Sequence, residues 1–205
     1  MIARVFVSIK YAFERLSGPR TRADELYDVR RRLVEQAGPR VASHAERQLA
    51  LELRLLREKL GARLGTVEAC AGCARPRSAD WPGGGCCSGH TQDLFTDGEL
   101  AALKLAGTTP ARLRAPRARH AGCAFRGPRG CSLEAAHRPC QCVRYMCREL
   151  GRELDRRGDG RASARLQEEL RAGFERFVEL RNERITARRT PRRSSGGPRL
   201  GEAGW

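Results

Sequence analysis

The residues of this sequence that could carry chemistry are its nine cysteines, all of which lie in the middle of the chain. Four fall within residues 70–87 and five within residues 123–147. A thiolate can act as a nucleophile, a redox group or a metal ligand. In a reducing compartment, clustered cysteines bind metals more often than they form disulfides, and an odd number leaves one thiol without a partner. The cysteines therefore predict a metal site.

The first group opens with a C-x2-C motif, Cys70 and Cys73, in which Gly72 allows the tight turn that brings two thiolates onto one metal. Redox pairs of the thioredoxin type share this spacing, but the βαβ pattern of that fold is not visible in the sequence. Cys86 and Cys87 are adjacent, and in extended backbone adjacent side chains point to opposite sides. These two thiols would serve two sites more easily than one.

In the second group, Cys142 and Cys147 are five residues apart. On an unbroken helix this spacing is about 140° of rotation, too far for the two thiolates to share one ion easily. The spacing favours either two metal sites or one larger cluster that ligands approach from several sides.

The cysteines belong to an ordered series of short motifs, and the combination is more specific than any one of them. The residues are Cys70, Cys73, Cys86 and Cys87, then Thr96 with Glu99, Cys123 with Phe125, Gly130 and Cys131 with Leu133, and Arg138 and Pro139 leading to Cys142, Tyr145 and Cys147. Over about residues 70 to 148 this series resembles the YkgJ-type cysteine-cluster family of zinc- or iron-chelating domains. The resemblance implies metal chelation. Some relatives are linked to methylation of flagellin lysines, but no substrate site carries over to this sequence.

Three positions depart from the family pattern. Residues 74–85 separate Cys73 from Cys86 where the family usually has two residues, and Val143 stands where it usually has arginine. Cys140 is an extra cysteine, which we expect to be a small buried residue and not a ligand. The resemblance thus implies eight metal ligands: Cys70, Cys73, Cys86, Cys87, Cys123, Cys131, Cys142 and Cys147.

Thiolate ligation suits both zinc and iron–sulfur clusters. Two zinc sites would use eight thiols, whereas one [4Fe–4S] cluster would use four and leave the others structural or free to hold a second cluster. We favour iron–sulfur over zinc because several thiols lie in segments interrupted by glycine and proline. His90 and His137 lie within a few residues of cysteines and could ligate zinc, but eight thiols already suffice without them, and His44 and His120 are expected at the surface.

The formal net charge is +16, with 40 Lys and Arg residues. Only three of these are lysines, and charges of both signs alternate in the helical segments, so we attribute the excess to composition and expect no specific nucleic acid partner. Between residues 111 and 150, nine arginines accompany two acids. Cations beside a thiolate site would offset its negative charge, and Arg126, Arg138 and Arg144 are the candidates.

The elements that must position these residues are predicted from apolar spacing. It indicates amphipathic helices over residues 2–17, 21–36, 41–64 and 163–187. The third repeats leucine from Leu49 to Leu64, a stripe expected to pack within the chain and not as a coiled-coil seam. Gly61 and Gly65 are expected to mark its fraying end. A further helix should begin at Thr96, with Glu99 completing a capping box, and end near Ala106.

Together these elements predict a mainly α fold with little or no sheet, in which a small loop-rich metal module packs among amphipathic helices. Residues 1–65 form a helical segment and residues 66–150 the cysteine-cluster module. Residues 151–189 form a C-terminal helix that packs on the module, and residues 190–205 a disordered tail.

Three classes of function fit this pattern: a metal-binding accessory or redox protein, a cluster-dependent enzyme of methyltransferase-like or redox type, and a zinc-stabilised nucleic-acid-binding protein. The sequence offers no nucleophile–base pair, phosphate loop or dinucleotide motif, which favours the first class and identifies no catalytic residue. A protein partner is compatible with it, and the oligomeric state is not determined. No stretch is apolar enough to span a membrane and no secretory pattern opens the chain, so we expect a cytoplasmic protein.

Overall fold

The computed structural model describes residues 22–65, 91–116, 123–127 and 130–189. Within these ranges the chain is mostly helical, with one antiparallel pair of two-residue strands, so the predicted mainly α fold is confirmed. The elements are α2 (Arg22–Glu35), α3 (His44–Leu64), α5 (Thr91–Leu94), α6 (Asp97–Leu105), η1 (Pro110–Arg112), β1 (Arg126–Gly127), β2 (Gly130–Cys131), η2 (Ala135–His137), α7 (Cys140–Arg144), α8 (Arg148–Arg156) and α9 (Gly160–Arg189). The predicted helix at 2–17, the first cysteine group and the predicted tail lie outside the described residues.

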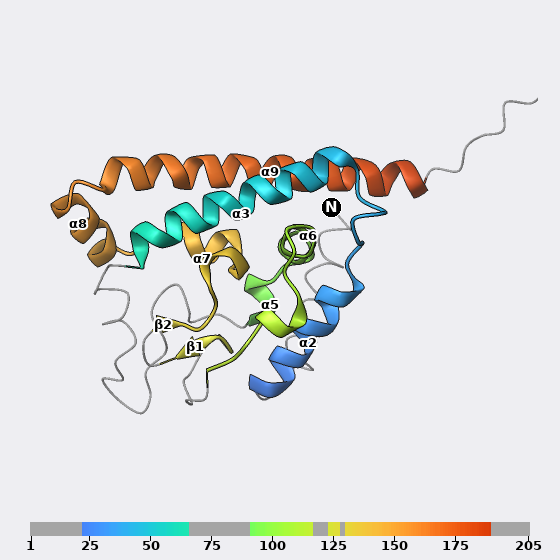
Figure 1. The fold of residues 1–205 in the computed structure, drawn as a ribbon, viewed down its shortest axis with the longest axis horizontal. Helices are drawn as coiled ribbons and strands as arrows, with labels where there is room; N and C mark the ends of the chain where they lie inside the picture. The colour runs from blue at the N-terminus through green and yellow to red at the C-terminus, as the bar shows by residue number, and fades with distance from the viewer. Residues whose placement is uncertain (1–21, 66–90, 117–122, 128–129, 190–205) are drawn as a thin grey trace, which may run out of the picture.

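The two longest helices, α3 and α9, run side by side in opposite directions and form one layer of the molecule (Figure 1). Leu53 and Leu60 of α3 are fully buried against Leu170 and Phe177 of α9, so the leucine stripe packs within the chain, as predicted. We call this cluster the helical core. Its buried members are Ala42, Ala50, Leu53, Leu60, Ala101, Ala102, Leu105, Ala106, Cys140, Val143, Leu170 and Phe177.

The start of α3 is fixed by a capping box. Ser43 Oγ accepts a hydrogen bond from the N–H of Glu46 (3.1 Å), and the Glu46 carboxylate accepts one from the N–H of Ser43 (2.7 Å). Arg184 of α9 donates to the same carboxylate at 2.8 Å. The first turn of α3 is therefore held both by its own cap and by α9.

Of the two glycines predicted to mark the end of α3, Gly65 does so and Gly61 does not. The helix continues to Leu64 and is capped by Gly65. Gly61 is instead the place where η2 packs against α3, because a Cβ atom at this position would lie 2.2 Å from the Cβ of Ala135. Glycine is present there for close approach between two backbones.

A second apolar cluster lies where α2, α5, α6 and the strand pair converge, below the layer of α3 and α9 (Figure 1). The rings of Phe95 and Phe125 are 5.2 Å apart at its centre and pack at 49°. We call this cluster the cysteine core. Its buried members are Val29, Leu33, Leu94, Phe95, Leu100, Leu103, Leu113, Cys123, Phe125 and Leu133.

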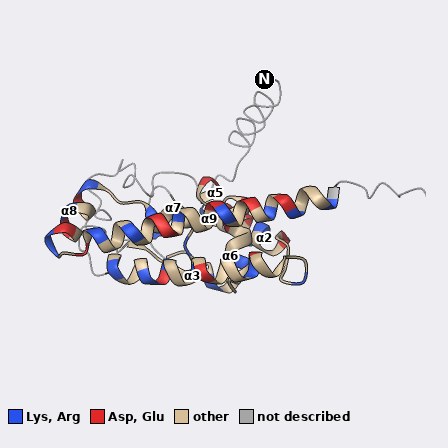
Figure 2. Ribbon diagram, turned by 90° about the horizontal axis from the view of Figure 1, so that it is seen from above, with Lys and Arg blue, Asp and Glu red and all other residues tan. Residues whose placement is uncertain are grey.

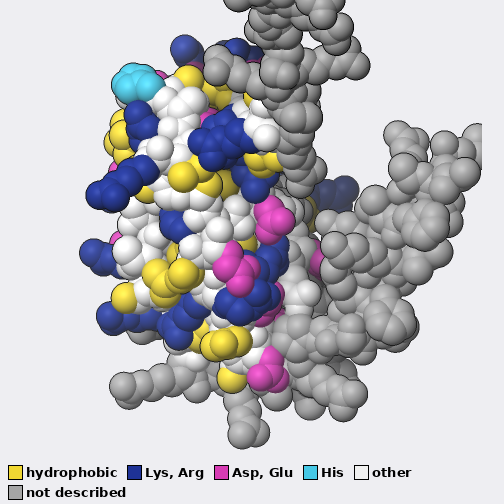
Figure 3. All heavy atoms as spheres, turned by 90° about the vertical axis from the view of Figure 1, so that its right-hand side faces the viewer, with side chains coloured by type: hydrophobic (Ala, Val, Ile, Leu, Met, Phe, Trp, Pro, Cys, Tyr) yellow, Lys and Arg dark blue, Asp and Glu magenta, His cyan; other side chains and the backbone are white. Residues whose placement is uncertain are grey.

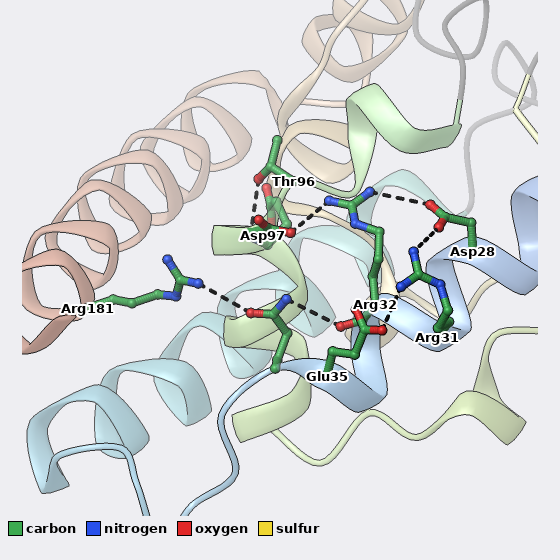
Figure 4. A network of polar contacts seen from close by, with 9 residues as sticks. Asp28, Arg31, Arg32, Glu35, Thr96, Asp97 and Arg181 are labelled. Atoms are coloured by element: carbon green, nitrogen blue, oxygen red, sulfur yellow. Dashed lines mark hydrogen bonds and ion pairs between the residues drawn. The ribbon is translucent and has the colours of Figure 1, made fainter. Parts of the chain in front are cut away.

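Polar contacts at the edge of α2 join it to two other helices (Figure 4). Arg32 of α2 contacts Asp97 at the start of α6 (2.9 Å). Arg181 of α9 donates to the side chain of Gln36, directly after α2, at 3.3 Å. These contacts connect the helix that contributes to the cysteine core with the layer that forms the helical core.

The predicted capping box of α6 forms only in part. Thr96 Oγ1 accepts a hydrogen bond from the N–H of Glu99 (3.3 Å), as expected, and Phe95 and Leu100 are both buried in the cysteine core. The Glu99 carboxylate, however, points to α7 and accepts a hydrogen bond from the N–H of Gln141 (3.4 Å). The helix ends at Leu105, before Gly107, whose φ of +90° suits glycine.

Helix α8 is not anticipated by the sequence analysis. Only Leu150 and Leu154 are apolar in its nine residues, and both are buried beside Leu64 and Met146. Helix α9 then begins at Gly160 and extends the predicted helix at both ends. A short helix gains most of its stability from packing against other elements. Two buried leucines are therefore enough to stabilise α8, which packs against α9.

Charges of both signs alternate along α3 and α9 (Figure 2). On α9 they form exposed ion pairs, among them Arg165 with Glu169 (2.9 Å) and Arg171 with Glu175 (2.8 Å). The face drawn in Figure 3 carries basic side chains scattered among apolar and acidic ones. No helix of the described ranges is long and apolar enough to cross a membrane.

Candidate metal centre

Five of the predicted module's cysteines lie in the described residues, and they divide among three apolar clusters. Cys123 is a buried member of the cysteine core, and Cys131 and Cys142 pack against that core. Cys140 belongs to the helical core, and Cys147 packs beside the leucines of α8. Cys140 and Cys147 are free thiols. The residues Cys70, Cys73, Cys86, Cys87, His90 and His120 lie outside the described ranges.

Arg22 holds the turn that carries Cys123. Its Nη2 atom donates to the carbonyl oxygens of Cys123 (2.8 Å), Ala124 (3.2 Å) and Arg126 (2.6 Å). Burial lowers the pKa of Arg22, whereas negative charge on Cys123 and Glu25 acts in the opposite direction. Since arginine stays charged under ordinary conditions, a cation lies next to this thiol.

Thr91, the first residue of α5, holds the same turn. Its Oγ1 atom accepts a hydrogen bond from the N–H of Ala124 (2.8 Å), donates one to the carboxylate of Glu25, and lies 3.8 Å from Cys123 Sγ. Thr91 is fully buried and Glu25 nearly so. A thiol, a hydroxyl and a carboxylate therefore form a buried polar chain between the turn and α2.

Cys131 is placed by the strand pair, in which it lies opposite Arg126. The N–H of Arg126 donates to the carbonyl of Cys123 (2.9 Å), so one short hairpin carries both cysteines. Ser132 Oγ donates to the carbonyls of Arg114 (2.7 Å) and Phe125 (3.0 Å) and fixes the end of the second strand.

Helix α7 presents two cysteines to two different clusters. Cys142 contacts the cysteine core, whereas Cys140 and Val143 are buried in the helical core. Cys140 Sγ accepts a hydrogen bond from Arg57 (3.4 Å). Burial, followed by the charge of Glu99, raises the pKa of Cys140 to about 12, so this thiol is neutral at pH 7. The expectation that Cys140 is a small buried residue is confirmed.

Cys147 is the N-cap residue of α8. Its Sγ atom accepts a hydrogen bond from the N–H of Leu150 at 3.4 Å. The N-terminus of a helix stabilises negative charge. Cys147 therefore caps α8 through its sulfur, as a serine or threonine hydroxyl caps other helices.

The two described histidines, His44 and His137, differ in burial and in contacts. His137 Nδ1 lies 3.0 Å from Thr108 Oγ1, and Nε2 lies 3.6 Å from the carboxylate of Glu134. Burial lowers the pKa of His137, which favours the neutral ring. With both nitrogens engaged, His137 does not support a zinc site, and His44 is exposed, as expected.

The three arginines predicted to surround the thiols differ in position. Arg126 is buried opposite Cys131, and Arg138 donates to the carbonyl of Leu133 (2.8 Å). Arg144 is exposed and lines a small cavity on the side of Cys140. Arg22 was not predicted, because it precedes Cys123 by 101 residues and no local pattern connects the two.

No protein family, curated protein or solved structure matches this chain. The resemblance to the YkgJ-type family therefore stays a hypothesis. Within the described ranges, no three side chains of Cys, His, Asp or Glu are arranged to hold a metal ion. Cys123, Cys131 and Cys142 nevertheless pack against one core beside the cation of Arg22, and sulfur is a soft ligand of the kind that zinc and iron–sulfur clusters use.

Proposed function

We propose that this protein binds an iron–sulfur cluster or, as the alternative, zinc, and serves an accessory or redox role in the cytoplasm. The thiolates that would bind the metal are Cys70, Cys73, Cys86, Cys87, Cys123, Cys131, Cys142 and Cys147. The resemblance to YkgJ-type proteins and the clustering of cysteines in the sequence both support this proposal.

The observation that carries it is the packing of Cys123, Cys131 and Cys142 against one core. They come from a turn, a strand and a helix, and each of these elements is fixed by contacts outside itself. Because no three side chains of the described ranges are arranged to hold one ion, a four-thiolate site at this core would need ligands from the cysteines of residues 70–87. Arg22 would offset part of the negative charge of such a site.

The test is anaerobic purification followed by metal analysis and visible spectroscopy. A brown protein that contains iron and sulfide and has broad visible absorption supports the cluster. A colourless protein with about two zinc ions per chain would favour zinc. A full-length protein that is folded and contains neither metal contradicts the proposal.

Two neighbouring cysteines provide a matched pair of variants. Cys142→Ser should lower the metal content strongly, because it removes a proposed ligand. Cys140→Ser makes the same chemical change two residues away and should leave the metal content as it is. Equal loss in both variants, or in neither, would contradict the assignment of Cys142 as a ligand.

A further inference from the structure

The Glu99 carboxylate lies at a junction of three helices. It comes from α6, yet Oε1 accepts a hydrogen bond from the N–H of Gln141 in the first turn of α7 (3.4 Å). Burial raises the pKa of Glu99, and the charge of Arg57 and the N–H groups of Cys140 and Gln141 act in the opposite direction. Glu99 is 3% exposed, so this contact is shielded from water. The first turn of α7 is thus held by a buried carboxylate from another helix.

Arg57 of α3 completes this junction. Its guanidinium is fully buried, lies 4.0 Å from Glu99 Oε2 and donates to Cys140 Sγ. Arg57 Nε, Arg57 Nη1 and Glu99 Oε2 have no hydrogen-bond partner among the described residues. A buried ion pair with unsatisfied atoms is poor evidence for a stabilising contact, so its presence indicates a role in specificity.

The geometry of α7 suggests that role. Cys140 and Cys142 are two residues apart, which is about 200° of rotation on a helix, so they face opposite ways. The pair of Arg57 and Glu99 contacts the first turn of α7 and the thiol of Cys140 together. Any rotation of α7 that brought Cys140 toward the cysteine core would break both contacts.

We propose that Glu99 and Arg57 are positioning residues that set the rotation of α7 and thereby select Cys142, and not Cys140, as the metal ligand. This inference rests on the proposed metal-binding function. Without the pair, α7 should stay packed but be able to rotate about its axis. The thiolate of Cys142 would then be placed less accurately for binding the metal.

The decisive variant replaces both members of the pair, E99L together with R57M. Because both charges are removed and the side-chain volumes are similar, the thermal stability of the metal-free protein should stay at or above that of the unsubstituted protein. The affinity for zinc or cobalt, measured by competition with a chromophoric chelator, should fall roughly 10- to 100-fold, the range seen when outer contacts of metal ligands are lost. The cobalt absorption bands should also broaden.

The chain offers a matched control. Arg54 and Glu58 form an ion pair of 2.9 Å on the same helix α3, but both side chains are 41% exposed. The double variant R54M and E58L should keep its affinity within about twofold, as expected for an exposed pair. E99Q retains an acceptor for α7 and should show a smaller loss than E99L with R57M.

The outcomes separate the two proposals. Metal binding by the unsubstituted protein with unchanged affinity and spectrum in E99L with R57M overturns the inference and leaves the metal site intact. A further substitution could restore the thermal stability of a destabilised E99L and R57M variant. If it also restored the metal affinity, the pair would have a structural role only, and this result too would overturn the inference. Absence of metal binding in the unsubstituted protein overturns the proposed function itself, and the inference with it.

Discussion

The helical core and the cysteine core are built in different ways. The helical core joins two long helices through large apolar side chains, and its contacts repeat along many turns. The cysteine core joins short elements, and side chains such as Arg22 and Thr91 hold its backbone by hydrogen bonds across long stretches of sequence. Each contains a cysteine at a central position, Cys140 in one and Cys123 in the other.

The two buried thiols also differ in their polar neighbours. Cys140 is shielded among apolar side chains and faces a carboxylate, which keeps it neutral. Cys123 lies next to a guanidinium and a hydroxyl. Burial and the Glu99 carboxylate raise the pKa of Cys140 even though the Arg57 guanidinium contacts its sulfur.

The largest contrast between the cores should come from metal removal. Treatment with a chelator should make residues 123–147 sensitive to protease, while α3 and α9 keep their helical circular dichroism. Structural zinc contributes on the order of 10 kcal/mol in small peptides, enough to decide whether short elements fold. Unchanged protease resistance of this segment after complete removal of metal would contradict the prediction.

The helical core should be most sensitive to loss of apolar volume. Phe177→Ala removes a fully buried ring and should lower the free energy of unfolding by about 3–5 kcal/mol in urea titration. Tyr27→Ala, at an aromatic residue that is 70% exposed, is the control and should change it by less than about 0.5 kcal/mol. Similar effects of the two variants would contradict the assignment of the core.

A smaller effect is expected at Arg22. Arg22→Ala removes the donor to three carbonyls around Cys123 and should cost about 1.5–3 kcal/mol, with faster hydrogen exchange at residues 123–127. Arg31→Ala, on the exposed side of the same helix, is the control and should be nearly neutral. Exchange rates that stay unchanged in Arg22→Ala would show that the turn does not depend on α2.

The smallest effect concerns Glu46 and pH. Burial alone would raise the pKa of Glu46, but hydrogen bonds from Arg184 and Ser43 outweigh it and lower that pKa below the ordinary value of 4.5. A carboxyl with a lowered pKa in the folded state stabilises the fold at pH above 4.5, and this contribution is lost as pH falls through the folded pKa. Glu46→Gln should remove about 1 kcal/mol at pH 7 and less at pH 3. An equal loss at both values would contradict the role of the charge.

The sequence predicts the helical core better than the cysteine core. Apolar spacing locates α2, α3 and α9, since a helix with one apolar stripe identifies itself locally. The Glu99 carboxylate is assigned to its own capping box because that motif is also local, whereas its partners Arg57 and Gln141 come from other helices. Leu113 belongs to no predicted helix and carries no local sign of burial, yet it is fully buried and accepts hydrogen bonds from Arg30.

In the candidate site, too, local patterns are visible in the sequence and contacts between distant residues are not. Thiol spacing indicates that the cysteines act together, and the extra Cys140 is recognised from a motif. Arg22 and Thr91 carry no signal of their own, because threonine and arginine occur throughout the chain and only the fold brings them to Cys123. Side chains that support a site from a distance are therefore the part that a single sequence conceals.

The contact between Gly61 and Ala135 has a consequence for the evolution of this chain. Because no other side chain fits at position 61 while alanine occupies position 135, the two positions are not free to change separately. A homologue with alanine at the first should carry glycine at the second, or a shortened η2. Covariation between these sites would trace the spacing of α3 and η2 through descent, independently of any metal.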